Sequence, residues 1–238
     1  MKAVILAGGK GTRLRPYTTF LPKPLMPIGE MPILEIMLRQ LKRAGVDDVI
    51  LTVGHLGSLL QAYFQDGHKL GVNLDYSFEN KPLGTAGPLA LVRDRLTDTF
   101  LITNGDVLTT LDLRDLIRSH RTTGAAATIA MQARQVNIDL GVLEFDDSFI
   151  LTGYREKPSY NFHVSMGINV LEPRTLDYLD GDEYCDLPDL ILRLIDAGEK
   201  VVGYPFSGYW QDLGRPDDYE QAVHDFEEMR DRLLPEDE

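Results

Sequence analysis

The sequence is poor in several features that would otherwise define its class. It contains a single cysteine, Cys185, in 238 residues, and one thiol cannot form an intrachain disulfide. A chain without disulfides suits a reducing compartment, so we expect a cytoplasmic protein. No apolar run approaches the roughly 20 residues that a membrane helix needs, and the first apolar segment is too short for a secretory signal. We therefore expect neither a disulfide-stabilised secreted domain nor a membrane partner.

Positive charge is also scarce. The chain has 24 lysines and arginines against 37 aspartates and glutamates, a formal net charge of -13. Nucleic acid presents a dense array of phosphates and needs a basic surface, so we expect no nucleic acid polymer as a partner. The five histidines are scattered and lack the spacing of a zinc site. With 43% hydrophobic residues the composition is that of an ordinary globular protein that can bury a sizeable core.

One stretch reverses this charge balance. Residues 1–29 contain no acidic residue, and a loop with glycines at positions 8, 9 and 11 follows an apolar strand at residues 3–7. Glycine lets backbone N–H groups approach an anion closely, and phosphate is the usual anion. We therefore expect a polyphosphate to bind here. The same stretch contains five cations, Lys2, Lys10, Arg13, Arg15 and Lys23.

Two familiar phosphate-binding loops do not fit. The Walker pattern requires Gly-Lys followed by Ser or Thr, whereas Thr12-Arg13 follows the third glycine. The dinucleotide pattern G-x-G-x-x-G ends on Leu14, where a glycine is needed. A plain strand-to-helix turn remains an alternative, but it leaves the cluster of cations without a role.

Helical and strand patterns alternate along the first half of the chain. Apolar periodicity predicts helices at residues 32–44 and 55–64, and β-branched apolar runs predict strands at residues 49–53 and 72–78. Short strand–helix units indicate a parallel, doubly wound α/β sheet. Ligands of such sheets bind beyond the carboxyl ends of the strands, so the loops that follow strands are the candidate sites.

The loop at residues 79–88 is one of these candidates. It precedes a helix expected at residues 89–95, and Gly84 and Gly87 leave open backbone near the helix start. Such backbone suits the holding of a flat nucleobase by main-chain hydrogen bonds. An ordinary connection between elements is an equally good interpretation of the composition alone.

A second candidate loop follows the apolar strand that begins at Phe100. The strand ends in Asn104-Gly105-Asp106, which delivers a carboxylate to its carboxyl end. A lone aspartate is often the N-cap of the next helix, but Asp112 is better placed to cap the helix expected from residue 113. Because a divalent ion that bridges phosphates needs carboxylate oxygens, we take Asp106 as a metal ligand.

The second half of the chain predicts antiparallel strands. Apolar patterns indicate strands at residues 125–131, 141–145, 150–154 and 164–171, with a turn between the second and third of them. We expect a mixed sheet whose second half covers the site. A helix at residues 187–197 capped by Asp186, a strand at 200–204 and a helix from Pro216 follow, and the acidic tail from Asp225 is expected to be a frayed end.

The glycine loop resembles the signature of the sugar-1-phosphate nucleotidylyltransferases, or NDP-sugar pyrophosphorylases. Their pattern G-G-x-G-T-R-L-x-P is present without a gap, and a lysine lies about ten residues beyond its arginine. The resemblance extends to about residue 222. It implies a Rossmann-like, doubly wound, mostly parallel mixed sheet of the nucleotidyltransferase (GT-A-like) type, with Arg13 and Lys23 as catalytic residues. The implied nucleotide-binding residues are Leu6, Ala7, Gly8, Gly9, Gly11, Thr12, Glu79, Pro82, Gly84, Thr85, Asn104 and Gly105.

Three later motifs extend the resemblance. Gly208 to Pro216 matches the family pattern G-Y-W-x-D-[IL]-G-x-P, which implies that Asp212 joins Asp106 in binding Mg²⁺. Glu-Lys-Pro at residues 156–158 matches a motif that contacts the sugar and its phosphate, although such a pair is more commonly a solvated surface pair. The strand at residues 164–171 departs from the sequence Asn-Ala-Gly-Ile-Tyr that is common in the family, so the resemblance does not specify the sugar. The implied sugar-phosphate residues are Gly141, Glu156, Lys157 and Asn169.

The resemblance implies an enzyme that joins an NTP and a sugar 1-phosphate into an NDP-sugar and releases pyrophosphate. The string at residues 84–91 is most similar to GDP-mannose pyrophosphorylases, so we expect GTP with mannose 1-phosphate or a related hexose or heptose 1-phosphate. A dTTP- or UTP-dependent enzyme is the alternative within the class. A non-catalytic regulatory relative that binds NDP-sugar and a nicotinamide-dependent oxidoreductase are the alternatives outside it. We expect one domain, residues 1–238, without a C-terminal β-helix, and leave a homo-oligomer open.

Overall fold

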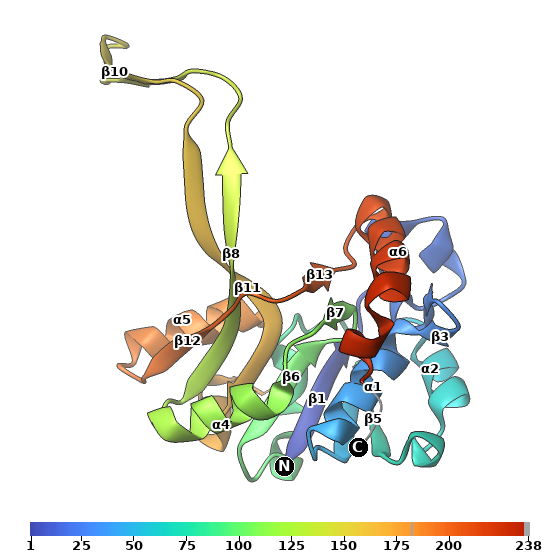
Figure 1. The fold of residues 1–238 in the computed structure, drawn as a ribbon. Coiled ribbons are helices and arrows are strands. Elements are labelled where there is room, and N and C mark those ends of the chain that lie inside the picture. Colours follow the sequence, from blue (N-terminus) through green and yellow to red (C-terminus); the bar gives the residue numbers. More distant parts are fainter. Residues whose placement is uncertain (182, 236–238) are drawn as a thin grey trace.

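The protein folds around a seven-stranded sheet with helices on both faces (Figure 1). The computed structural model describes residues 1–181 and 183–235. Across the sheet the strands run β12 (Val201–Phe206), β8 (Ala127–Asn137), β11 (Ser159–Leu171), β6 (Phe100–Asn104), β1 (Lys2–Ala7), β4 (Asp48–Val53) and β5 (Asn73–Phe78).

The pairing confirms the expected mixed, mostly parallel sheet. Strand β1 lies in the middle of the parallel half and pairs with β4 and β6, and β5 extends that half beyond β4. Strand β11 is antiparallel to both of its neighbours, β6 and β8, whereas β12 is parallel to β8. The two halves therefore meet at β6 and β11, and the carboxyl ends of β1, β4 and β6 share one edge of the sheet.

Each face of the sheet buries its own apolar core. One core receives α1 (Ile33–Arg43), α2 (Gly57–Phe64) and α4 (Leu113–Thr123), and the other receives α3 (Gly87–Ala90) and α5 (Leu187–Asp196). The helix expected at residues 89–95 was too long, because α3 ends at Ala90 and a separate 3-10 turn follows. The short 3-10 helices are η1 (Thr12–Leu14), η2 (Tyr17–Thr19), η3 (Lys23–Leu25), η4 (His68–Leu70), η5 (Arg93–Arg95) and η6 (Pro173–Tyr178).

Local chemistry accounts for the helix ends that matter later. Helix α4 begins at Asp112, whose side chain accepts a hydrogen bond from the backbone N–H of Arg114, as a capping residue should. Helix α5 begins with a capping box, in which Asp186 and Asp189 each bond the other's backbone. Among the described residues, no helix combines the length and apolar character that crossing a membrane would require.

The expectation of a frayed tail from Asp225 was wrong. Helix α6 (Pro216–Leu233) continues through that residue, with a kink at Met229. Ala222, Phe226 and Leu233 are buried in a third apolar cluster against α1 and the segment after β1. A run of charges predicted solvent exposure, but one apolar side chain per turn is enough to dock an amphipathic helix. Residues 236–238 of the expected tail lie outside the described part of the chain.

The described residues also form three pairs of short strands. Strands β2 (Pro27–Ile28) and β3 (Met31–Pro32) form one, and β7 (Val107–Thr109) pairs with β13 (Trp210–Asp212). Strands β9 (Val142–Phe145) and β10 (Leu151–Arg155) form the expected hairpin. The second half of the sheet was expected to cover the site, but this hairpin does not lie over it (Figure 1). The hairpin lies at the end of a long projection, residues 133–163, which we call the arm (Figure 1).

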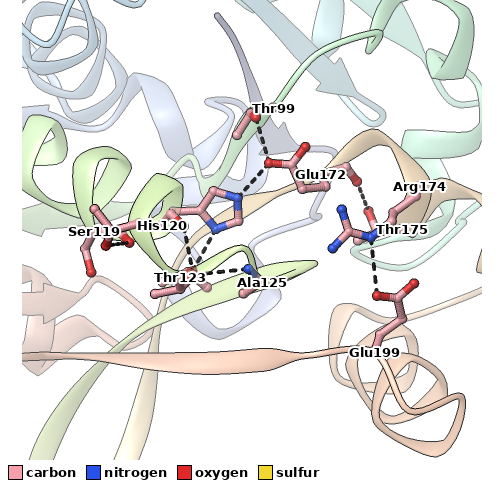
Figure 2. Close-up of polar contacts among 11 residues, drawn as sticks. Thr99, Ser119, His120, Thr123, Ala125, Glu172, Arg174, Thr175 and Glu199 are labelled. Carbon is pink, nitrogen blue, oxygen red and sulfur yellow. Dashed lines mark hydrogen bonds and ion pairs between the residues drawn. The ribbon is translucent and has the colours of Figure 1, made fainter.

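A buried polar network ties α4 to the end of β11 (Figure 2). The His120 side chain is 1% exposed, and its ring nitrogens bond the hydroxyl of Thr128 at 2.7 Å and the carboxylate of Glu172 at 3.0 Å. Thr99 donates a further hydrogen bond to the same Glu172 oxygen. These contacts join a helix, a strand and two connecting segments, so the network is a structural clasp.

We expect His120→Ala to lower the free energy of unfolding by about 2–4 kcal/mol, because it opens a cavity and leaves buried partners unsatisfied. Arg174→Ala is the matched control in the same region, since it breaks only the exposed Arg174–Glu199 pair and should cost less than about 0.5 kcal/mol. Urea unfolding of both variants measures the difference. Equal free energies of unfolding for the two variants would show that the His120 network does not contribute to stability.

Candidate active site

The glycine loop after β1 is held in shape by its own backbone and by one hydroxyl. Gly11 has a φ of 59°, a left-handed conformation that favours glycine. Its carbonyl accepts hydrogen bonds from the hydroxyl of Thr18 at 2.6 Å and from the backbone N–H of Leu14 at 3.0 Å. The loop thus turns sharply at the carboxyl end of β1, where the doubly wound fold predicts a ligand.

Glu79 connects this loop to the loop after β5. Its backbone N–H donates to the Val53 carbonyl at 2.9 Å, and its carboxylate accepts from the backbone N–H of Leu83 at 3.2 Å. A Cβ at Gly8 would overlap an oxygen of that carboxylate, so the Glu79 side chain would have to move to admit one. Burial raises the pKa of Glu79, and the hydrogen bond from Leu83 partly opposes this. The predicted nucleotide residues Gly8 and Glu79 are therefore in direct contact.

The loop at residues 83–87 is anchored by the start of α5. Thr85 donates from its backbone N–H at 3.1 Å and from its hydroxyl at 3.2 Å to the Asp186 carboxylate, and that hydroxyl accepts from Leu187. The Cys185 carbonyl accepts hydrogen bonds from the backbone N–H groups of the two residues that follow Thr85. Gly84 has a φ of 80°. Sequence reasoning assigned Asp186 only as a helix cap and missed this second role, which no local pattern signals. Pro82 directly precedes this loop.

The two predicted metal ligands come together on paired strands. Asp106 precedes β7 and Asp212 ends β13, and Asp212 pairs with Val107 in the antiparallel register. The backbone N–H of Leu213 donates to the Asp106 carbonyl at 3.1 Å. Residues more than a hundred positions apart are thereby held side by side beyond the carboxyl end of β6.

Two cations face these carboxylates. The Lys23 ammonium forms an ion pair with Asp106, and its side chain is only 10% exposed. Arg13 lies against Gly214, where an added Cβ would be 3.5 Å from the guanidinium and 3.2 Å from the Asp212 carboxylate. Burial raises the pKa of Asp212, as does the neighbouring Asp106, while Lys23 and Arg13 act in the opposite direction. The structure thus brings together all four residues predicted for the metal and for catalysis.

The donor set fits a hard divalent cation. Two carboxylates lie together in a partly buried place where ionisation of Asp212 is disfavoured, and an added cation would relieve this. No cluster of three or more metal-binding side chains occurs among residues 1–181 and 183–235. Mg²⁺ is commonly held by one or two carboxylates and completes its coordination with substrate phosphates and water.

The remaining predicted site residues near β6 differ in whether they lie beside the site or inside the sheet. The backbone N–H of Gly105 donates to the Leu6 carbonyl at 3.0 Å, which joins the loops after β1 and β6. Gly167, on β11, has a φ of 72° and lies against the Asn104 amide. Asn169 is 1% exposed, and neither polar atom of its amide has a hydrogen-bond partner in the described chain. It lies in the sheet and not at an accessible surface.

The other predicted sugar-phosphate residues lie on the arm. The Tyr154 hydroxyl donates to Glu156 at 3.1 Å, and a Cβ at Gly141 would collide with that hydroxyl. Lys157 follows at the connection to β11, with a φ of 43°. Gly141, Glu156 and Lys157 are therefore neighbours of one another, but the arm carries them away from the glycine loop (Figure 1).

A stacked cation at the base of the arm was not foreseen. The Trp210 indole donates to the Met166 carbonyl at 2.9 Å, and the Arg134 guanidinium lies 5.2 Å from the ring centroid. Trp210 is a packing anchor, as expected, and it fixes the strand that ends in Asp212. No sequence signal links Arg134 to it.

A hollow elsewhere on the described chain does not coincide with this cluster. It is open to solvent on one side, has a volume of about 220 Å³ and is bordered by Gln40, Arg43, Asp112, Arg114 and Leu233. None of these is a predicted site residue. We give the four-residue cluster more weight, because its charges and its place at the strand ends suit a phosphate ligand, whereas cavity size carries no chemistry.

Comparison with known proteins gives a family and several relatives. The family described as "Nucleotidyl transferase" matches residues 2–229. A UTP–glucose-1-phosphate uridylyltransferase from Synechocystis is 36% identical over 94% of this chain and 62% of its own length. A mannose-1-phosphate guanylyltransferase from Mycobacterium tuberculosis is 34% identical over 94% of this chain and 64% of its own length. The chain thus spans less than two thirds of these two relatives.

A solved structure agrees with the fold. A Bacillus anthracis protein, provisionally described as a glucose-1-phosphate thymidylyltransferase, superposes with a TM-score of 0.78 over 100% of this chain and 97% of that one. Its sequence identity is 23%, so this likeness bears on the fold alone.

Proposed function

The chain belongs to the nucleotidyl transferase family, and from that premise we propose that it transfers a nucleoside monophosphate from an NTP to a sugar 1-phosphate and releases pyrophosphate. The observation that carries the proposal is the cluster of Asp106, Asp212, Lys23 and Arg13 beside the glycine loop. Two carboxylates and two cations at the carboxyl ends of strands suit a triphosphate and its metal ion.

In the reaction, a sugar phosphate oxygen attacks the α-phosphorus, and the bond from that phosphorus to the bridging oxygen of pyrophosphate breaks. Catalysis of such a step rests on positioning and on neutralisation of charge. The backbone of the glycine loop holds the phosphates, and Arg13 offsets the charge that develops on them. Asp106 and Asp212 would hold Mg²⁺, which, when bound, screens the phosphate oxygens from the incoming anion.

The Lys23–Asp106 ion pair has a second role in this scheme. With no divalent ion present, the ammonium neutralises a carboxylate that would otherwise stand beside another carboxylate. Lys23 would bind phosphate oxygens when a triphosphate occupies the site, and the Asp106 carboxylate would then be available to Mg²⁺. The pair therefore joins a proposed substrate contact to a proposed metal ligand.

On the nucleotide side, we favour guanine. Guanine offers an N1–H and an exocyclic amine as donors, so its pocket needs acceptors. The half-buried Glu79 carboxylate is such an acceptor, and it lies between the glycine loop and Leu83. Uracil and thymine offer one N–H donor and would leave acceptors unpaired, which a buried site rejects strongly. The guanylyltransferase relative is consistent with this choice, and the uridylyltransferase relative keeps the alternative open.

Two other functions are disfavoured by particular residues. A non-catalytic regulatory relative would be expected to lack Arg13, Lys23 or one of the two aspartates, and the chain retains all four. A nicotinamide-dependent oxidoreductase needs an acidic residue at the end of the second strand for the ribose, and Gly54-His55 follows β4 instead. A single cysteine that is buried and unpaired suits a reducing compartment such as the cytoplasm.

The test is a panel of the four NTPs with several sugar 1-phosphates and Mg²⁺, read as pyrophosphate release. We expect kcat/KM for GTP to exceed that for dTTP and UTP by about a hundredfold or more, because wrong bases leave the Glu79 acceptor unpaired. Glu79→Gln should reduce this preference. A higher kcat/KM for dTTP or UTP with every sugar phosphate would overturn the guanylyl assignment, and absence of pyrophosphate from every pair would overturn the activity.

A further inference from the structure

The arm has no support from the rest of its own chain. Strand β12 pairs with β8 only from Ala127 to Gln132, and β6 pairs with β11 only from Ile168 to Leu171. From Ala133 outward, the two long strands pair only with each other within the described chain. A two-stranded ribbon with both faces open is at best marginally stable in water. The arm would therefore be stabilised by packing against another protein surface.

The end of the arm is unusually apolar for an exposed segment. Half of the exposed large apolar side chains in the described chain lie on these residues, 133–163. The rings of Phe145 and Phe149 stack with centroids 5.3 Å apart, yet Phe149 is 81% exposed. Exposed apolar groups gathered in this way mark an interaction surface. We call this group the apolar tip: Leu140, Leu143, Phe145, Phe149, Ile150 and Leu151.

The arm also carries substrate residues beyond the reach of their own site. Gly167 lies against Asn104, at the level of the site. From there β11 runs outward to Ser159, a span of about 25 Å at about 3.3 Å per residue. Lys157 lies beyond that end, and its positive φ is the kind of backbone strain that concentrates at functional positions. In one chain, the phosphate-binding cluster and the Glu-Lys pair are thus separated.

The rest of the chain, which we call the body, has exposed apolar side chains beside the glycine loop that could contact the apolar tip. Phe20 is 84% exposed and Tyr17 is 55% exposed, and both lie between Arg13 and Lys23 in the sequence. The Tyr17 ring lies 6.2 Å from that of Tyr219 on α6. Figure 1 shows α6 and this dark blue segment on one side of the molecule and the arm rising from the other. A chain cannot cover its own apolar loop with its own tip in this conformation.

We propose that the protein acts as a two-fold symmetric dimer in which the arm of each chain lies over the glycine loop of its partner and delivers Glu156 and Lys157 to the partner's sugar phosphate. The proposal rests on the proposed function, since it places the sugar-phosphate half of the site in trans. A second copy of the chain fits the arm for two reasons. Its four-residue cluster has no Lys157 of its own nearby, and its Phe20 is exposed beside the glycine loop. Two-fold exchange of identical elements satisfies both chains at once.

A mixed dimer tests the exchange directly. The Arg13→Ala and Lys157→Ala variants are coexpressed with different affinity tags, and the heterodimer is purified on both. In trans, one of its two sites combines an intact body with an intact arm, so turnover should recover to about half of the wild-type value, well above either parent. If each arm instead serves its own chain, one site of the heterodimer contains Arg13→Ala and the other contains Lys157→Ala, so neither site is intact. A heterodimer as slow as its parents, beside an active wild type, would overturn the proposal.

The oligomeric state gives a readout that does not depend on activity. We expect the wild type to sediment as a dimer and the double variant Phe145→Ser, Phe149→Ser as a monomer with unchanged circular dichroism. Leu192→Ser is the matched control, because Leu192 is also exposed, at 57%, but lies on α5 outside the arm. It should remain a dimer. A monomeric wild type at assay concentrations, or a double variant that stays dimeric, would contradict the exchange. Absence of pyrophosphate from a dimeric wild type would instead count against the proposed function.

Discussion

Asp106→Asn and Asp212→Asn should each lower turnover by about a hundredfold or more, because each removes one of the two carboxylates that suit a divalent ion. The substitution keeps the shape of the side chain and removes its charge. Both residues lie on the paired strands β7 and β13 or at their start, so the backbone that positions the substrates remains. The measurement is kcat at saturating NTP, sugar 1-phosphate and Mg²⁺.

Asp212→Asn should remain folded, and the pKa of Asp212 gives the reason. Because burial and Asp106 raise that pKa above its unfolded value, the ionised carboxylate opposes folding at neutral pH, and this cost disappears as the pH falls and the group is protonated. Asp212→Asn should therefore leave the Tm of the metal-free protein unchanged or higher. Asp98→Asn, in the exposed loop before β6, is the control for turnover. Near-normal turnover of either active-site variant would remove that residue from the site.

Arg13→Ala should lower kcat by about a hundredfold, equivalent to about 2.7 kcal/mol of transition-state stabilisation, with a smaller change in the KM for NTP. The guanidinium lies against Gly214 beside the Asp212 carboxylate, where it can follow charge that develops on the phosphates. An interaction that strengthens in the transition state affects kcat more than binding.

Arg15→Ala is the matched control for this variant, because Arg15 is an exposed cation two residues away. It should change both constants only slightly. Lys157→Ala should show the complementary pattern, because it should raise the KM for the sugar phosphate more than it raises the KM for NTP. If Arg13→Ala raised the KM for the sugar phosphate and left kcat unchanged, the two phosphates would have been assigned to the wrong ends of the site.

The parts of the fold set by local pattern were predictable. Strand β4 is a short apolar, β-branched run, and α1 repeats apolar residues at helical spacing, so both were found within a residue or two. Asp112 was identified as a cap because its side chain acts on the adjacent turn. The carboxylate pair was found differently. Asp106 followed from its place after a strand, whereas Asp212 depended on the resemblance, since no local property separates it from other aspartates.

The features that could not be predicted from the sequence depend on contacts between segments that are far apart in it. The outer residues of β8 and β11 alternate weakly and lack a third strand, so the length of the arm could not be read from hydrophobic pattern. The role of Asp186 at the loop containing Thr85 depends on the packing of α5 beside α3. The burial of Phe226 depends on α6 docking against the segment after β1, which outweighs the acidic composition of that helix.

The most direct measurement of the central claim follows the α-phosphorus of the nucleotide. Two reactions are run in parallel, one with the NTP radiolabelled on its α-phosphorus and one with it radiolabelled on its γ-phosphorus, each with sugar 1-phosphate and Mg²⁺. Our account predicts that the α label appears in a sugar nucleotide and the γ label in pyrophosphate, in equal amounts. Transfer of the γ label to the sugar phosphate, or its release as inorganic phosphate, would contradict nucleotidylyl transfer.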